Sequence, residues 1–222
     1  MKKEDLGPKC REVFMKISSN FDAGNIKVIE ATSPGNVRLE INKDAHSDFF
    51  QWFYFRCSGA QGQKCQLHIE NAKDAAYIGG WESYQAVASY DRENWFRVDT
   101  TYANGTLTIN HTPAYNATYY AYFAPYSMER HADLIADCTM SPLVTPHVLG
   151  ATLDGQDLDL LEVKSEEGEG EKLNCWFIAR QHPGESMAEW WIEGMLGRLL
   201  DEADPVSRSL LKACNFYIVP NM

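Results

Sequence analysis

Short runs of alternating, β-branched or aromatic residues fill the chain from about residue 26 to residue 123. Clusters of Gly, Asn, Pro and Ser separate these runs at intervals typical of an antiparallel sandwich. Asn104 and Gly105, between two such runs, supply the positive φ angles that a type I′ hairpin needs. We therefore predict an all-β domain over residues 1–140, with strands at 26–30, 37–41, 49–57, 66–71, 85–90, 95–102, 106–111 and 118–123.

The pattern changes after residue 140. Pro142 and Pro146 lie in a stretch that neither a helix nor a central strand tolerates well, so we place the domain boundary there. Strand, helix and strand in this order make a βαβ unit with a parallel sheet and a right-handed crossover. The predicted fold is an antiparallel all-β sandwich followed by the start of an α/β domain with a mixed sheet at residues 147–222. Its elements are a hairpin over 148–163, a strand at 173–180, a helix at 187–200, a short helix from Pro205 and a strand at 215–219.

The helix at 187–200 has apolar residues at spacings that share one face, which we expect to be its buried side. These residues are Met187, Trp190, Trp191, Gly194, Met195 and Leu199.

Composition limits the classes of partner. The chain has 20 Lys and Arg against 31 Asp and Glu, a net charge of −11, and no basic stripe with interleaved aromatics. Nucleic acid and anionic membrane surfaces are therefore poor partners. No apolar run approaches the roughly 20 residues that cross a bilayer, and residues 1–10 lack the apolar core of a secretory signal. We expect a cytoplasmic protein.

Its six cysteines form no C-x-x-C pair, which disfavours a cysteine zinc site and favours free, buried thiols.

The stretch Arg180–Glu185 carries the candidate chemistry, because it lies where the strand ends and the helix begins. Ligands bind at the carboxyl ends of strands in open α/β sheets. Pro183 suits the first helical position, so His182 points out from the strand end and Glu185 follows about one turn later. An imidazole and a carboxylate that converge are suitable zinc ligands. A histidine before a helix is commonly a cap or a hydrogen-bonding residue, and only the combination of strand, His-Pro-Gly-Glu turn and helix favours a metal site.

Four segments together resemble one family. Arg180–Glu185 is similar to the first zinc motif of the carboxypeptidase A-like metallocarboxypeptidases, and specifically of their cytosolic carboxypeptidase (Nna1-like) branch. Tyr122–Ser127 with Arg130 and His131 resembles the signature that closes the N-terminal sandwich of that branch. The opening strands of the sandwich are matched by Phe21–Ile26 and Gln51–Arg56.

The resemblance implies a zinc enzyme that removes C-terminal amino acids, possible substrates being acidic, glutamate-containing tails of peptides or proteins. His182 and Glu185 would be two of three protein ligands to one zinc ion. A glutamate would act as general base, and an arginine would stabilise the oxyanion and hold the substrate carboxylate. Arg180 is a candidate for contact with the substrate or for support of the metal ligands, although a plain structural arginine at a strand end fits equally well.

The sequence departs from the family pattern because no histidine follows Glu185. The third ligand, the asparagine–arginine substrate motif and the general base, and with them the catalytic residues, are expected beyond residue 222. The histidines before His182 are interpreted as structural or surface residues. The strands at 173–178 and 216–219 are expected to leave apolar edges exposed, which favours the N-terminal portion of a longer enzyme.

Two other interpretations remain open at this point. The sandwich can be a non-catalytic interaction module that precedes an incomplete metal site. A zinc acylase that removes an acyl group from an amino acid shares the H-x-x-E start, but the residues ahead of the motif speak against it.

Overall fold

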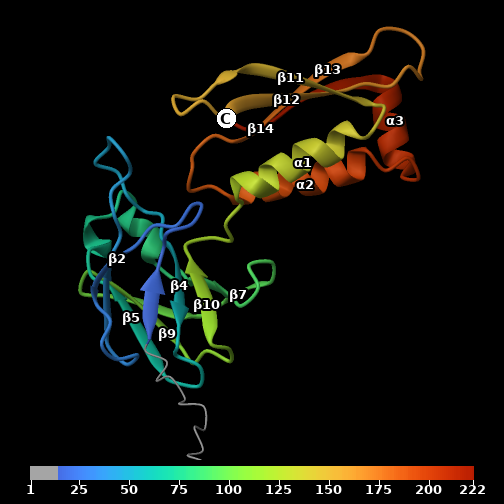
Figure 1. Cartoon of the computed structure of the whole chain (residues 1–222). Helices are drawn as coiled ribbons and strands as arrows, with labels where there is room; N and C mark the ends of the chain where they lie inside the picture. Colours follow the sequence, from blue (N-terminus) through green and yellow to red (C-terminus); the bar gives the residue numbers. More distant parts are fainter. Residues whose placement is uncertain (1–14) are drawn as a thin grey trace, which may run out of the picture. The chain divides into compact units, whose positions relative to one another are not determined.

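The computed structural model describes residues 15–222, which form two compact units, the first ending at Tyr122 and the second spanning Phe123–Met222. Each unit is described by itself (Figure 1). The N-terminal segment 1–10, considered above as a signal sequence, lies outside the described residues. None of the helices within residues 15–222 is long and apolar enough to span a membrane.

The first unit consists of two five-stranded sheets. All of its strand pairs are antiparallel except β3 with β5, which is parallel. One sheet has the order β1 (Lys16–Ser18), β4 (Tyr54–Ser58), β10 (Ala117–Ala121), β6 (Val87–Ser89) and β7 (Trp95–Arg97). The other has the order β2 (Lys27–Glu30), β3 (Val37–Glu40), β5 (Cys65–Ile69), β9 (Thr106–His111) and β8 (Asp99–Ala103). Two short 3₁₀ helices, η1 (Ala72–Asp74) and η2 (Ile78–Trp81), lie between β5 and β6.

The predicted strands are largely confirmed in this unit, with two differences, and β1 was not predicted. The strand predicted at 49–57 begins only at Tyr54, and the side chain of Phe49 is exposed. The strand predicted at 95–102 is two strands in different sheets, because the chain passes from β7 to β8 at the buried Val98. The Asn104-Gly105 turn has φ values of 51° and 84°, as the hairpin prediction requires.

The two sheets of the sandwich contact each other through buried side chains. The hydroxyl of Tyr120 in β10 lies 2.9 Å from Nδ1 of His111 in β9, which joins the sheets by a hydrogen bond. Cys57 and Cys65 are buried and free, as predicted. Burial raises the pKa of the Cys57 thiol to about 12, so it stays protonated near neutral pH.

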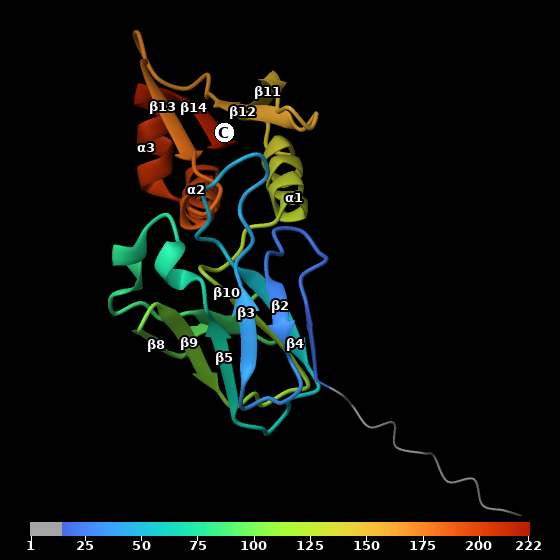
Figure 2. The same cartoon turned by 90° about the vertical axis from the view of Figure 1, so that its left-hand side faces the viewer.

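The second unit is a four-stranded mixed sheet with helices on one face (Figures 1 and 2). The strand order is β11-β12-β14-β13, in which β13 and β14 are parallel and the other pairs antiparallel. This confirms the predicted βαβ unit. Its elements are α1 (Met128–Thr139), β11 (Val144–Ala151), β12 (Asp157–Val163), β13 (Leu173–Arg180), α2 (Met187–Leu199), α3 (Pro205–Ala213) and β14 (Cys214–Asn221).

The boundary between the units lies earlier than the one placed at 140–147. Helix α1 occupies residues that were assigned to the sandwich, and its core residues pack with those of the second unit. The two prolines do not separate domains. Pro142 lies in the turn after α1, and Pro146 lies within β11, an edge strand, where a missing N–H is tolerated.

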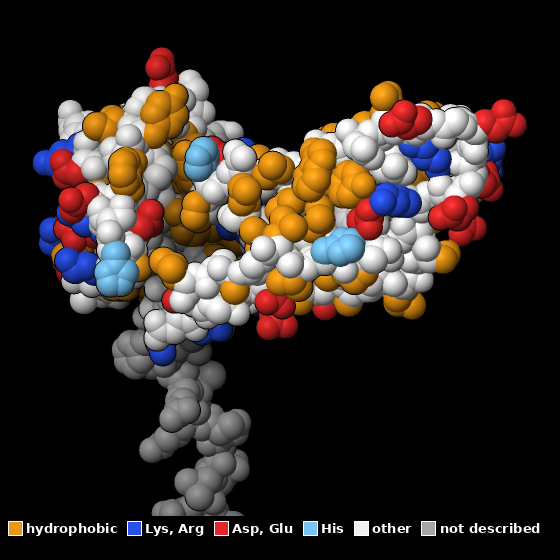
Figure 3. Space-filling view, turned by 90° about the horizontal axis from the view of Figure 1, so that it is seen from above, with side chains coloured by type: hydrophobic (Ala, Val, Ile, Leu, Met, Phe, Trp, Pro, Cys, Tyr) orange, Lys and Arg blue, Asp and Glu red, His pale blue; other side chains and the backbone are white. Residues whose placement is uncertain are grey.

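The helices cover only one face of the mixed sheet. The opposite face has exposed apolar side chains, including Trp176 and Ile178 of β13. Figure 3 shows hydrophobic side chains gathered on this unit. The expected exposure of 173–178 is therefore confirmed in part, whereas 216–219 is largely buried because β14 is a central strand.

Helix α2 buries a different face from the one predicted. Its buried residues are Glu189, Ile192, Leu196 and Leu199. Of the predicted set, Leu199 is buried as expected, and Trp190 and Met195 are partly buried at the edge of the core. Met187 and Trp191 are exposed by 44% and 56%. Glu189 lies on the buried face, and a charged residue there made the apolar stripe in the sequence appear to lie on another side of the helix.

Candidate metal centre

The candidate site lies at the carboxyl end of β13. Arg180 is the last residue of this strand, and its carbonyl accepts a hydrogen bond from the Met222 N–H at 2.9 Å, next to the end of β14. The chain then turns, with the Glu185 N–H donating to the His182 carbonyl at 3.0 Å. A strand end followed by a tight turn is a common place for ligand-binding side chains.

Pro183 belongs to this turn and not to the following helix, which corrects the sequence prediction. Helix α2 begins at Met187, with Ser186 as its N-cap residue. Proline favours the second position of a four-residue turn because its φ is already fixed near −65°. The Ser186 hydroxyl donates to the Ala124 carbonyl at 2.8 Å and thereby fixes the end of the turn.

The turn brings His182 and Glu185 together, as their spacing predicts. Nδ1 of His182 lies 3.0 Å from Oε2 of Glu185. Their side chains are 73% and 55% exposed, so both donor atoms are accessible from solvent. Their role as metal ligands stays a prediction.

The donor set fits one part of a zinc site. Zinc accepts imidazole nitrogen and carboxylate oxygen, and two tetrahedral ligand atoms at about 2.0–2.1 Å from the metal lie about 3.3 Å apart. The 3.0 Å separation needs only a small widening to reach that value. A Cβ on Gly184 would meet no atom within 4 Å, so the space above the turn is open. Residues 15–222 contain no group of three or more His, Cys, Asp or Glu side chains that could hold a metal ion.

Arg180 points into the protein, and its side chain is only 11% exposed. Its guanidinium donates to the Pro183 carbonyl from Nη2 at 2.6 Å and from Nε at 3.2 Å. Nη1 donates to the Tyr126 carbonyl at 3.0 Å and to Oε2 of Glu189 at 3.0 Å. The sequence left open three roles for Arg180, namely contact with a substrate, support of the metal ligands and a plain structural role. The side chain contacts the turn, and its role at the site stays a prediction.

Glu189 is completely buried, and both of its carboxylate oxygens are hydrogen-bonded. Oε2 accepts from Arg180, and Oε1 lies 2.7 Å from Nδ1 of His131 in α1. The other ring nitrogen of His131 lies 3.1 Å from Oδ2 of Asp159 in β12. Burial by itself lowers the pKa of His131, but the hydrogen bonds with the two carboxylates outweigh it and raise the pKa above its usual value.

A second ion pair lies one turn further along α2. Arg130 donates to both carboxylate oxygens of Glu193, from Nη2 at 2.6 Å and from Nε at 2.8 Å. Its guanidinium also lies 4.1 Å from the ring centre of Trp190, a cation–π contact. The segment at 126–131 was assigned above to the end of the sandwich. It instead contains the first turn of α1, and Arg130 connects that turn to α2 within the second unit.

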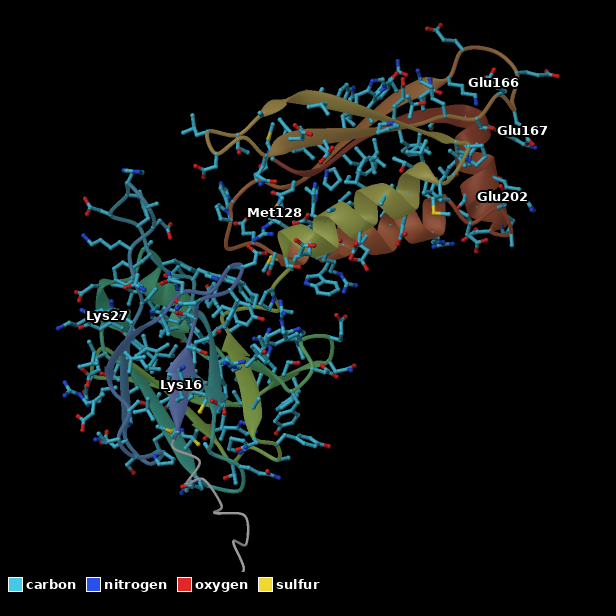
Figure 4. The ribbon with its side chains drawn as sticks, in the orientation of Figure 1. Lys16, Lys27, Met128, Glu166, Glu167 and Glu202 are labelled. Carbon is cyan, nitrogen blue, oxygen red and sulfur yellow. The ribbon has the colours of Figure 1, made fainter. Side chains whose placement is uncertain are left out.

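The acidic loop between β12 and β13 is remote from the candidate site. Figure 4 shows Glu166 and Glu167 at one end of the second unit and Met128, the first residue of α1, at the other. Met128 lies at the same end of the second unit as the candidate site. Its sulfur accepts a hydrogen bond at 3.8 Å from the side-chain amide of Asn221, which pairs with Arg180 across β13 and β14. The acidic loop precedes β13 and the turn follows it, so the length of the eight-residue strand, about 25 Å, separates them.

Sequence reasoning missed Glu189 and assigned His131 only a structural role near a boundary. The sequence held one sign that Glu189 is unusual: it is a charged residue four positions after Glu185, in a largely apolar helix. No local signal pairs it with His131, which lies 58 positions earlier in the chain.

Two family models match the chain. The model described as cytosolic carboxypeptidase N-terminal domain matches residues 17–123, and the model described as zinc carboxypeptidase matches residues 128–222. The gap between them lies close to the boundary of the two compact units.

Relatives and solved structures agree with these matches. An uncharacterized protein of Zymomonas mobilis is 52% identical over 209 residues, which are 94% of this chain and 53% of that protein. Human cytosolic carboxypeptidase 1 is 24% identical over 250 residues, covering 93% of this chain and 20% of the human protein. The crystal structure of a metallo-carboxypeptidase from Burkholderia cenocepacia superimposes with a TM-score of 0.90 at 48% identity, over 93% of this chain and 55% of that one. The chain thus spans about half the length of these bacterial relatives.

Proposed function

We propose that the protein carrying this chain, which belongs to the cytosolic carboxypeptidase branch of the zinc carboxypeptidase family, hydrolyses the C-terminal residues of peptides or proteins. His182 and Glu185 are two of the zinc ligands in this proposal. Its main support is the 3.0 Å approach of Nδ1 and Oε2 at the carboxyl end of β13, within the residues that the zinc carboxypeptidase model matches.

The residues of this chain hold and orient the metal. His182 and Glu185 present a nitrogen and an oxygen donor from one short turn, and Ser186 fixes the end of that turn. When bound, zinc in such a site lowers the pKa of a water ligand to about 7 and polarises the carbonyl to be cleaved. We assign the third ligand, the general base and the groups that bind the substrate carboxylate to the part of the family's domain that this chain does not cover.

Two finer points belong to the same proposal. A C-terminal glutamate is the first substrate to test, with Lys and Leu as comparisons, because acidic tails are the substrates that the family resemblance suggests. A cytoplasmic location is supported by the relatives whose names are cytosolic carboxypeptidases.

The test uses the native protein, with its complete sequence, and peptides that end in Glu, Lys or Leu. We expect about one zinc per chain by elemental analysis and release of at least one of the three residues. His182→Ala should remove most of the bound zinc and abolish release, because zinc loses its nitrogen donor from the turn. His147→Ala is the matched control, since His147 is also an exposed histidine of the second unit but pairs with Glu162 on the β11–β12 hairpin.

A native protein that holds zinc equally well with and without His182 refutes the assigned ligand. A zinc-free native protein that releases none of the three residues would favour the alternative, a non-catalytic interaction module.

A further inference from the structure

A buried set of charges lies directly behind the turn that carries His182 and Glu185. It consists of Arg180, Glu189, His131 and Asp159, which come from β13, α2, α1 and β12. Its contacts with the turn run through the guanidinium of Arg180, which donates twice to the Pro183 carbonyl in the middle of the turn.

One backbone hydrogen bond lies within the turn, from the Glu185 N–H to the His182 carbonyl. The end of the turn is held by the Ser186 hydroxyl on the Ala124 carbonyl and by the Ala188 N–H on the Glu185 carbonyl. Both ligand side chains are more than half exposed. Because packing does not fix these side chains, the backbone of the turn must set the direction of both. The position of the Pro183 carbonyl therefore controls where the two donor atoms lie.

Glu189 determines the direction of the guanidinium. A wholly buried carboxylate is costly unless every oxygen is paired, and here each oxygen has one charged or polar partner. Oε2 holds Nη1 of Arg180, while His131 holds Oε1 and is itself held by Asp159 on its other side. A neutral imidazole donates from only one nitrogen, so two carboxylate partners favour the protonated ring. Two positive and two negative charges then balance.

Stability alone does not account for this arrangement. Replacing a buried ion pair by well-packed apolar residues is commonly neutral or stabilising, so such a pair is weak evidence for a stabilising role. The neighbouring pair of Arg130 and Glu193 offers a comparison, because its guanidinium lies over the Trp190 ring.

We propose that Arg180 and Glu189 are positioning residues of the metal centre: Glu189, anchored by His131, aims the Arg180 guanidinium at the Pro183 carbonyl and so pre-forms the turn in which His182 and Glu185 bind zinc. This inference rests on the proposed function, because it takes the turn to be a zinc site.

The experiment measures zinc affinity of the native protein by competition with a chromophoric chelator, at a temperature well below the melting temperature of each variant. Arg180→Lys keeps the charge but loses the fork that reaches the carbonyl, and Glu189→Gln keeps the size but loses the charge that holds the guanidinium. Groups that orient metal ligands typically contribute about 10–100-fold to affinity. We expect the dissociation constant for zinc to rise at least about tenfold in both variants.

Glu193→Gln and Arg130→Lys are the matched controls, because they make the same changes in the second ion pair of α2. We expect their zinc affinity to stay within about twofold of the wild type, even where the melting temperature of the metal-free protein falls. Arg180→Lys, as the milder change, keeps the test open if Glu189→Gln does not fold.

Unchanged zinc affinity in a folded Arg180→Lys protein would overturn the inference. An equal loss in the test and control variants would also overturn it, since that would indicate a general effect of destabilisation. His182→Ala separates the two proposals: if it leaves zinc binding intact, the proposed site itself is wrong, whereas loss of zinc in His182→Ala with no effect of Arg180→Lys refutes only the positioning role.

Discussion

Ile192 provides a direct test of which face of α2 is buried. It was absent from the apolar set predicted for this helix, yet its side chain is completely buried in the core of the second unit. Ile192→Ala removes three carbons, which at about 0.8 kcal/mol each correspond to about 2.4 kcal/mol of lost transfer free energy. The cavity left behind adds to this value, so we expect a loss of about 3–4 kcal/mol in the free energy of unfolding.

Met187 is the control on the same helix, because the sequence pattern placed it on the buried face and the structure leaves it 44% exposed. Met187→Ala should cost less than about 1 kcal/mol, as expected of a surface substitution. Urea unfolding followed by tryptophan fluorescence and by circular dichroism measures both losses. Equal losses for the two variants, or a larger loss for Met187→Ala, would refute the arrangement of α2 described above.

Two further predictions concern a charge and a turn. The pKa of His131 is raised on balance because hydrogen bonds with Glu189 and Asp159 outweigh its burial, so its protonated form stabilises the fold below the ordinary histidine pKa of about 6.5. That stability is lost as the pH rises through the folded-state pKa, and urea unfolding at a series of pH values should show a decline that is absent in His131→Gln. Gly105→Ala should destabilise the protein by about 1 kcal/mol or more, measured by thermal unfolding, because φ is 84° and the new Cβ would lie 3.0 Å from side-chain carbons of Lys73. A melting temperature equal to that of the wild type would contradict this second expectation.

The sequence predicted the elements whose signals are local. Strand β13, the start of α2 and the parallel strand β14 follow from apolar runs, and α3 begins at Pro205 as expected. Helix α1 was missed, although His131, Leu134, Ile135 and Cys138 have the spacing of one helical face. The buried polar His131 interrupted that pattern, since only its partners in other elements make it acceptable in a core.

In the candidate site too, the parts that depend on local sequence were predictable and the parts that depend on distant residues were not. The approach of His182 and Glu185 depends on a four-residue turn, and their spacing was sufficient to predict it. The inward direction of Arg180 depends on Glu189, whose burial in turn depends on His131 in a helix that the sequence analysis did not find. Long-range pairing of charges leaves no periodic pattern in a chain, so this part required the structure.

The position of β14 has a consequence for how the second unit is made. The last of its four strands in the chain is an inner strand of the sheet, between β12 and β13. Synthesis of the roughly 60 residues from Val163 to Asn221 takes about 3–12 s at about 5–20 residues per second. During that interval the β11–β12 hairpin can form, but the edge of β12 that pairs with β14 in the finished sheet is still open. Strand β13 also lacks β14, its partner among the four strands. Strand β14 must therefore insert between two strands, β12 and β13, that are synthesised before it.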